Sequence, residues 1–183
     1  LVEESSNFIR GNSLYTIVNG PTWTESEANA NKLGGHLVTI NDAQENQWLH
    51  DNNLHGWIGF TDKEVEGDWR WISGEEVTFV SWTSWDPDNI GNEDYAAKSG
   101  LQWGDANNIG TGNGGPNIKG VVETNFIRRG DSAYVIVEGP TWEEAEANAN
   151  KLGGHLVTIN DPEENQFLLD TFTEQLSLPD PNW

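Results

Sequence analysis

Short apolar runs bounded by turn residues recur along the chain. Residues 14–18 are rich in β-branched and aromatic side chains and end at the turn sequence 19–21, Asn-Gly-Pro. This pattern predicts a strand followed by a turn. The same reasoning predicts further short strands at residues 37–40, 57–60, 69–72, 77–79 and 121–123.

Two helices are predicted between the first strands. Thr22 followed by Glu25 is a capping-box pattern, and the pair of glycines at 34–35 ends the helix that this pattern begins. Asp42 followed by Glu45 marks a second helix start in the same way. Two early helices followed by several short strands predict an α+β fold.

The sequence contains an internal repeat. Residues 28–42 return unchanged as residues 147–161, and residues 7–10 return as 125–128. Just after the repeated run, Pro162 stands at a favoured first helical position. Such identity indicates a tandem array rather than two unrelated domains that share a helix.

The repeat divides the chain into three parts. We expect residues 1–6 to be the closing strand of a preceding repeat, residues 7–124 one complete unit, and residues 125–183 the first half of another. Within the complete unit, residues 83–117 are rich in Asp, Asn, Gly and Pro. This composition predicts a long irregular loop, which in a compact unit is usually functional.

Charge and composition exclude several classes of function. The 183 residues carry a formal net charge of -21, with no cysteine and no methionine. Because such an acidic surface repels phosphate backbones and anionic lipids, we expect neither nucleic-acid binding nor membrane insertion. The longest apolar runs fall far short of the roughly 20 residues of a membrane span.

Five carboxylates gather within the loop region and indicate a candidate binding site. They are Asp86, Asp88, Glu93, Asp94 and Asp105. The alternative is a solvated acidic face, which is the usual meaning of a run of charge. The acids lie in a polar sequence with no accompanying nucleophile or apolar pocket, so we expect no enzymatic activity.

The order of motifs in this region is similar to that of a known family. A Trp-Ile-Gly-Phe strand, an Asp-Pro-Asp turn, an Asn-Glu-Asp triplet and a Trp-Gly-Asp triplet follow one another before a closing strand. Together they resemble a C-type lectin-like domain, here of the cysteine-free, tandem-repeat type of bacterial and often cyanobacterial surface proteins. The resemblance implies an α+β fold in which two helices flank small antiparallel sheets, with a long irregular loop region.

The resemblance also implies calcium sites. The sugar-binding calcium position of the family falls on Asp86, Asp88, Glu93 and Asp105, and Gly104 replaces an asparagine ligand of the family. A second, structural calcium position falls on Asp62, Glu66, Asn89, Glu93 and Asp94. One or two Ca²⁺ ions are therefore expected, ordering the loops that family members usually fasten with disulfides.

Other aromatic and histidine residues have simpler expected roles. Trp85, next to the turn, is the candidate for stacking on a sugar, or it packs over the loop. Five tryptophans are expected in the core: Trp57, Trp69, Trp71, Trp82 and Trp103. His36 and His155 are expected to be structural, and the His50–His55 pair is a weak zinc candidate.

The preferred function is a calcium-dependent carbohydrate-binding module of an extracellular tandem-repeat surface protein. The alternative is a structural or adhesive repeat that contacts other proteins or forms filaments, with calcium structural or absent. Ice or mineral binding ranks third, because no flat Thr-rich face is evident. The expected partners are glycans or surface proteins, with head-to-tail self-association through the incomplete repeats. In that association the strand at residues 1–4 of another copy would pair with the strand around residues 134–137. Alone, residues 125–183 would expose these apolar residues: Val135, Ile136, Val137, Leu152, Leu156, Ile159, Phe167, Leu168 and Phe172.

Overall fold

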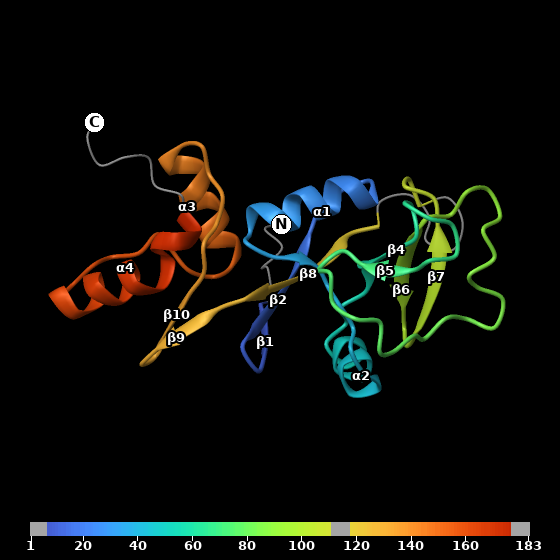
Figure 1. Cartoon of the computed structure of the whole chain (residues 1–183), viewed down its shortest axis with the longest axis horizontal. Helices are drawn as coiled ribbons and strands as arrows, with labels where there is room; N and C mark the ends of the chain where they lie inside the picture. The colour runs from blue at the N-terminus through green and yellow to red at the C-terminus, as the bar shows by residue number, and fades with distance from the viewer. Residues whose placement is uncertain (1–6, 111–117, 177–183) are drawn as a thin grey trace.

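The computed structural model describes residues 7–110 and 118–176 (Figure 1). Its helices are α1 (Trp23–Lys32), α2 (Ala43–Asp51), α3 (Trp142–Lys151) and α4 (Pro162–Leu176). Its strands are β1 (Phe8–Arg10), β2 (Ser13–Val18), β3 (His36–Leu37), β4 (Gly56–Thr61), β5 (Arg70–Trp71), β6 (Tyr95–Ser99), β7 (Gln102–Ala106), β8 (Gly120–Asn125), β9 (Ile127–Arg129) and β10 (Ser132–Tyr134). The α+β prediction is confirmed, whereas the closing strand expected at 1–6 lies outside the described residues.

One sheet of eight strands organises residues 8–125. Its order is β1-β2-β8-β4-β6-β7, with β3 also paired to β8 and β5 to β4. Strand β8 pairs along its whole length with β2 but meets β4 only at Gly120, opposite Trp57, and there the pairing is parallel. Helices α1 and α2 lie on either side of these strands (Figure 1). Strand β8 therefore joins the N-terminal strands β1 and β2 to the strands that carry the loop region.

The helix starts predicted from the sequence are confirmed. The Thr22 side chain accepts a hydrogen bond from the Glu25 backbone N–H at 3.1 Å, and the Asp42 carboxylate accepts one from the Glu45 N–H at 2.7 Å. Pro162 is the first residue of α4. These caps accept hydrogen bonds from backbone N–H groups that a helix leaves unpaired in its first turn. Because the capping residue lies next to that turn, it can be recognised from the sequence.

The tryptophans form the core beneath the loop region. Trp71 and Trp103 are buried, with Trp69 and Trp82 partly buried against them, and Trp57 is buried in a second cluster, as predicted. Phe60 lies at the centre of this cluster, with ring centroids 4.4 Å from Trp71 and 5.8 Å from Trp103. Stacked and edge-on aromatic pairs of this kind add to the energy of burial and fix where the neighbouring loops begin.

Two predictions for the middle of the chain were wrong. Residues 77–79 form no strand; they are irregular chain at the edge of the core, with Val77 exposed and Phe79 packed edge-on against Trp103. The stretch 83–117 is not irregular throughout, because β6 and β7 form an antiparallel hairpin inside it. That hairpin is stabilised by the pairing of β6 with β4, a contact between distant parts of the chain.

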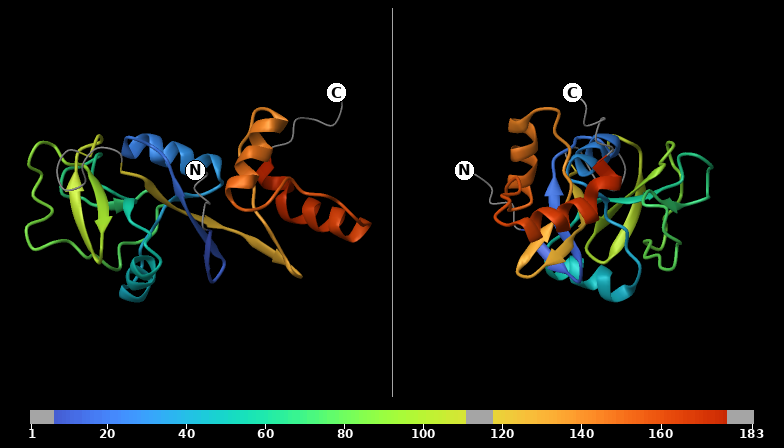
Figure 2. Two further views of the ribbon diagram at one scale, coloured as in Figure 1. Left: turned by 180° about the vertical axis from the view of Figure 1, so that it is seen from behind. Right: turned by 60° about the vertical axis from the view of Figure 1, so that its left-hand side comes forward.

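The C-terminal segment, residues 126–176, packs on the first part of the chain. Val135, Val137 and Leu152 join a cluster with Val18 and Leu33. The expectation that residues 125–183 expose their apolar side chains was therefore wrong for Leu152 and for Phe172, which are 9% and 7% exposed. Figure 2 shows α3 and α4 grouped at the end of the molecule opposite β6 and β7.

Lys98 is an unexpected member of the core. It is 2% exposed, its ammonium donates to the Gly100 carbonyl, and burial lowers the pKa of Lys98 to about 8. A lysine whose pKa is lowered on folding gives up its proton more readily in the native state, so stability increases as the pH rises from about 8 toward 10.5.

We expect Lys98→Met to stabilise the protein at pH 7 by roughly 1–3 kcal/mol, because it removes the desolvated cation and keeps the stem. Urea unfolding at pH 7 and pH 10 measures this effect. The variant should also lose the gain in stability between these two pH values. Lys151→Met, at an exposed lysine, is the matched control and should change little. Equal or lower stability of Lys98→Met would contradict the prediction.

Candidate functional site

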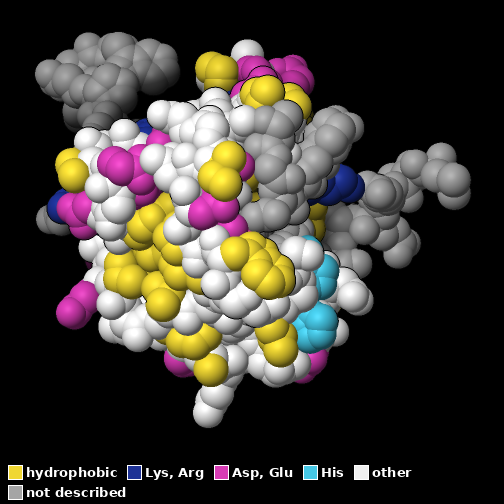
Figure 3. Space-filling model, turned by 90° about the vertical axis from the view of Figure 1, so that its right-hand side faces the viewer, with side chains coloured by type: hydrophobic (Ala, Val, Ile, Leu, Met, Phe, Trp, Pro, Cys, Tyr) yellow, Lys and Arg dark blue, Asp and Glu magenta, His cyan; other side chains and the backbone are white. Residues whose placement is uncertain are grey.

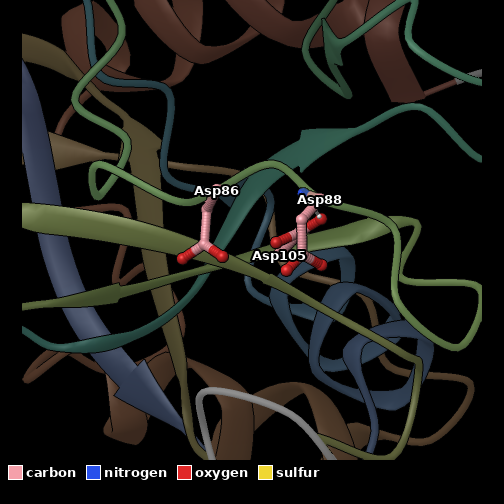
Figure 4. A group of neighbouring side chains, drawn as sticks. All are labelled: Asp86, Asp88 and Asp105. Carbon is pink, nitrogen blue, oxygen red and sulfur yellow. Dashed lines mark hydrogen bonds between the residues drawn. The ribbon is translucent and has the colours of Figure 1, made fainter.

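Three carboxylates meet where the loop after Trp82 passes the end of β7. Asp86 and Asp88 lie in the loop on either side of Pro87, whose peptide bond with Asp86 is cis. Asp105 lies in β7, paired opposite Ala96 of β6 and fully buried. Oxygen atoms of all three side chains lie within 4.8 Å of one another (Figure 4).

Asp105 fastens the loop to the strand. Its Oδ2 atom accepts hydrogen bonds from the backbone N–H groups of Asp88 and Asn89, both at 2.9 Å. Its Oδ1 atom is buried and has no hydrogen-bond partner. A buried carboxylate oxygen without a partner is costly, so this atom marks a place where a cation would be stabilising.

The charges around Asp105 repel one another. Glu93 is buried close by; its desolvation, reinforced by the charges of Asp105, Asp88 and Asp86, raises the pKa of Glu93 to about 7. Burial likewise raises the pKa of Asp105. A bound cation would remove this repulsion, since opposite charge favours the ionised carboxylates.

Acidic side chains also gather at the end of β4. Asp62 is 4% exposed; its Oδ2 atom accepts the Gly67 N–H at 2.8 Å, and its Oδ1 atom is buried without a partner. Burial and the charge of Asp94 raise the pKa of Asp62. Desolvation, together with the charges of Asp62 and Asp94, raises the pKa of Glu66.

The structure thus divides the predicted ligands into two neighbouring groups. The first brings Asp86, Asp88 and Asp105 within 4.8 Å of one another, and Glu93 interacts with them through its charge. The second holds Asp62, Glu66 and Asp94, which interact electrostatically, with Asn89 beside them. Among the described residues, these three carboxylates do not come as close together as the first three. Glu93, expected in both, interacts electrostatically with the first group, while its backbone N–H binds the Asn89 side chain. All these donors are oxygens, and each group includes a buried oxygen without a partner. The clustered oxygen donors of the first group fit Ca²⁺.

The surface beside the first group is both apolar and acidic. Trp85 is 72% exposed and Ile90 is 74% exposed. Figure 3, which faces this end of the molecule, shows hydrophobic side chains gathered in a patch with acidic side chains nearby. Gly104, which replaces an amide ligand, is buried in β7 opposite Ala97 and contributes no side chain.

Thr83 has a role that was not predicted from the sequence. Its hydroxyl donates to Asp86 Oδ2 at 2.7 Å and so orients one predicted ligand. The spacing of Thr83 and Asp86 is that of a local side-chain cap, and this signal was present in the sequence.

The histidines lie outside both groups. His36 Nδ1 is 2.9 Å from Glu27 Oε1, and this hydrogen bond raises the pKa of His36, in keeping with a structural role. The ring centroids of His50 and His55 are 5.5 Å apart. Within the residues that the structure describes, this pair belongs to no cluster of three or more metal-ligating side chains.

Comparison with known proteins agrees with this architecture. The family model of the lectin C-type domain matches residues 19–110, half of the chain. A perlucin-like protein of Mytilus galloprovincialis is 32% identical over 97 residues, covering 47% of this chain and 62% of the relative. The chain therefore spans less than two thirds of that relative's length.

Solved structures show the same fold. The carbohydrate-recognition domain of cow CD23, solved in the presence of a GlcNAc2Man3 oligosaccharide, has a TM-score of 0.59 at 20% identity, covering 70% of this chain and 98% of that one. A calcium-independent type II antifreeze protein has a TM-score of 0.56 at 21% identity, covering 65% and 91%. The fold alone therefore does not determine whether a member binds calcium or sugar. Both depend on the side chains at the site.

The described part of the chain contains no helix long and apolar enough to cross a membrane. Family model, relative and fold agree on one family, whose members are generally carbohydrate-binding. The chain belongs to the C-type lectin domain family.

Proposed function

We propose that this protein binds carbohydrate through a calcium ion held by Asp86, Asp88, Glu93 and Asp105. The observation that carries the proposal is the buried, unpartnered Oδ1 atom of Asp105 within a cluster of mutually repelling carboxylates. A cation satisfies that oxygen and removes the repulsion together. Bound calcium would coordinate neighbouring hydroxyl groups of the sugar.

The protein's own side chains supply the rest of the recognition. Ionised Asp86 and Asp88 accept hydrogen bonds from sugar hydroxyls and donate none, so they favour a ligand that presents two donors. The exposed ring of Trp85 lies next in sequence to this turn and can stack on the apolar face of a sugar ring. Asp105 holds the turn in place through the N–H groups of Asp88 and Asn89.

We propose that the second group holds a structural calcium ion. Asp62, Glu66, Asn89 and Asp94, with Glu93 between the two groups, come from two separate loops. An ion there would tie the loop after β4 to the loop before β6. It would replace the disulfides that the cysteine-free chain lacks.

A glycan array probed with and without a calcium chelator tests the sugar proposal. We expect a signal on glycans with neighbouring free hydroxyls that calcium supports and chelation removes. Asp105→Asn should lose this signal. Asp131→Asn, which removes a carboxylate of the C-terminal segment, makes the same change in net charge and should keep the signal. A signal that survives chelation, or no signal in calcium, would contradict the proposal.

Calcium affinity should depend on pH through Glu93. A ligand carboxylate must be ionised, and the pKa of Glu93 is raised to about 7. Protons therefore compete with calcium below that pH. We expect the affinity to be nearly constant above pH 7.5 and to fall by up to about tenfold per pH unit below 7. Calcium titrations from pH 5.5 to 8.5 measure this slope, and an affinity that does not change across this range would exclude Glu93 as a ligand.

We further propose that the protein is extracellular, that it is not an enzyme, and that residues 7–124 and 125–183 belong to successive repeats of the bacterial surface type.

The second candidate function is an adhesive repeat that contacts proteins. It is favoured by the 68% exposure of Trp142 outside the sugar site. Calcium-dependent stiffening without any glycan signal would favour this second candidate.

A further inference from the structure

The hydroxyl group of Tyr15 lies between two glutamate side chains, far from the carboxylates of the loop region in the chain. Tyr15, in β2, is 1% exposed. Its Oη atom is 2.7 Å from Glu45 Oε1 in α2 and 3.1 Å from Glu123 Oε1 in β8. Tyr15 and Glu123 stand directly opposite each other in the antiparallel pairing of β2 with β8. This one hydroxyl group therefore connects two strands of the sheet to helix α2.

A tyrosine hydroxyl group has only one proton to donate. An ionised carboxylate accepts hydrogen bonds and donates none. If both glutamates were ionised, one of the two contacts of Tyr15 would bring two oxygen atoms together without a proton between them, and these atoms would repel each other. Both contacts are hydrogen bonds only when one of the two carboxyl groups carries a proton of its own.

The surroundings of Glu45 favour its ionised form. Its Oε1 atom is 3.3 Å from the guanidinium group of Arg10, which also lies 3.9 Å from the Asp42 carboxylate. Its Oε2 atom accepts the backbone N–H of Asn41 at 3.0 Å. A positive charge and an N–H donor both stabilise a carboxylate. The short contact of 2.7 Å with the hydroxyl group is typical of a hydroxyl that donates to a charged oxygen.

The surroundings of Glu123 favour its protonated form. Burial raises the pKa of Glu123, and the negative charges of Glu45 and Glu75 raise it further. His36 stands opposite Glu123 in the pairing of β3 with β8, but its Nδ1 atom is 2.9 Å from the Glu27 carboxylate. Among the residues that the structure describes, no ion pair neutralises Glu123.

The repeat contains the same contacts without a second glutamate. The Tyr134 hydroxyl donates to Glu164 Oε1 at 2.8 Å, and Glu164 Oε2 accepts the Asn160 N–H at 2.9 Å. These residues occupy the places in the repeat of the tyrosine, the first glutamate and the asparagine described above. The N–H of Asn160 and the hydroxyl of Tyr134 lower the pKa of Glu164. A tyrosine paired with one glutamate in this way therefore needs no added proton, and the second carboxyl group at the first site does.

We propose that Glu123 keeps its proton in the folded protein and donates it to Tyr15, which donates in turn to Glu45, so that β8, β2 and α2 are joined by a pH-sensitive chain of hydrogen bonds. Loss of the proton breaks one of the two bonds and leaves two carboxylates repelling each other. Since the pKa of Glu123 is raised on folding, the native state binds this proton more tightly than the unfolded chain does. Stability therefore falls as the pH rises above 4.5, the ordinary value for this group, until Glu123 is ionised in the native state as well.

Carbon-13 NMR of the full chain, labelled at the glutamate carboxyl carbons, tests the proposal. A chelator is present throughout, so that calcium does not contribute. The resonance that is missing from Glu123→Gln identifies Glu123, and we expect its titration midpoint to lie clearly above 4.5. Tyr15→Phe then reports which group donates. Removing a hydroxyl that accepts the proton of Glu123 should lower this midpoint, whereas removing a hydroxyl that donates to an ionised Glu123 would raise it. A raised midpoint in Tyr15→Phe, or an ordinary midpoint in the original chain, overturns the proposal.

Two further variants and a measurement of stability keep this test specific. Glu45→Gln removes the neighbouring charge and should lower the midpoint of Glu123, whereas Glu164→Gln makes the same change at the matched position and should leave it unchanged. In urea unfolding, Glu123→Gln should lack the loss of stability that the original chain shows as the pH rises above 4.5, because the amide donates to Tyr15 at every pH. An equal loss in both chains contradicts the proposal. So does a Glu123→Gln variant that fails to fold, because glutamine reproduces the donor of the protonated carboxyl group.

Discussion

Asp105→Asn should abolish calcium binding at the first group and leave the fold intact. Asparagine keeps an oxygen that can accept the N–H groups of Asp88 and Asn89, so the loop stays fastened to β7. It replaces the unpartnered Oδ1 atom by an amide donor, which repels a cation. We expect the affinity to fall by at least about 100-fold, since even residues that only support metal ligands contribute 10- to 100-fold.

Calorimetric titration with calcium, run beside thermal unfolding, measures this effect. Without calcium, Asp105→Asn should unfold at the same temperature as the original chain or at a higher one, because one of several mutually repelling carboxylates is gone. With calcium, the original chain should gain stability and the variant should not. A variant that unfolds early without calcium would show that Asp105 is structural and not a ligand.

Asp62→Asn is the matched variant at the second group, because Asp62 also has one bonded and one unpartnered buried oxygen. If Asp105→Asn removes glycan binding and Asp62→Asn mainly lowers stability in calcium, the two groups have the roles proposed for them. If only Asp62→Asn changes the titration, calcium is structural, and sugar recognition through it is excluded. If neither variant changes it, both proposed sites are wrong.

Features that depend on neighbouring residues were predictable from the sequence. Thr22, Asp42 and Pro162 mark helix starts because capping involves residues within one turn. The strand β8 was predicted from its valines, and the buried tryptophans from their place in the family motifs. The grouping of carboxylates came from the family resemblance rather than from charge alone, since an acidic run by itself is usually a solvated surface.

Features that depend on distant contacts were not predictable in this way. Strands β6 and β7 contain Ala, Lys, Ser and Gly, which are poor strand formers, and pairing with β4 stabilises them. Residues 77–79 have good strand formers, yet no neighbouring strand pairs with them. The hydrogen bonds that Asp105 accepts from the turn join residues 16 and 17 positions apart, so no local sequence pattern predicts them.

Trp23→Ala should lower stability far more than Trp142→Ala, although the two tryptophans are matched in the repeat. Both tryptophans follow the same Gly-Pro-Thr sequence and open a helix of ten residues. Trp23 packs 4.8 Å from the Tyr95 ring, measured between centroids, and its indole N–H is bonded to Ile58. Its removal leaves a cavity and an unpaired carbonyl, so we expect a loss of about 3–5 kcal/mol.

Trp142 is 68% exposed, so Trp142→Ala should change the free energy of unfolding by no more than about 0.5 kcal/mol. Urea unfolding followed by circular dichroism measures both variants without relying on the tryptophan signal that they remove. Because the preceding sequence is shared, the difference between the two losses isolates what residues 56–124 contribute by covering Trp23. A loss at Trp142 as large as that at Trp23 would contradict the prediction, because it would mean that Trp142 is buried in solution.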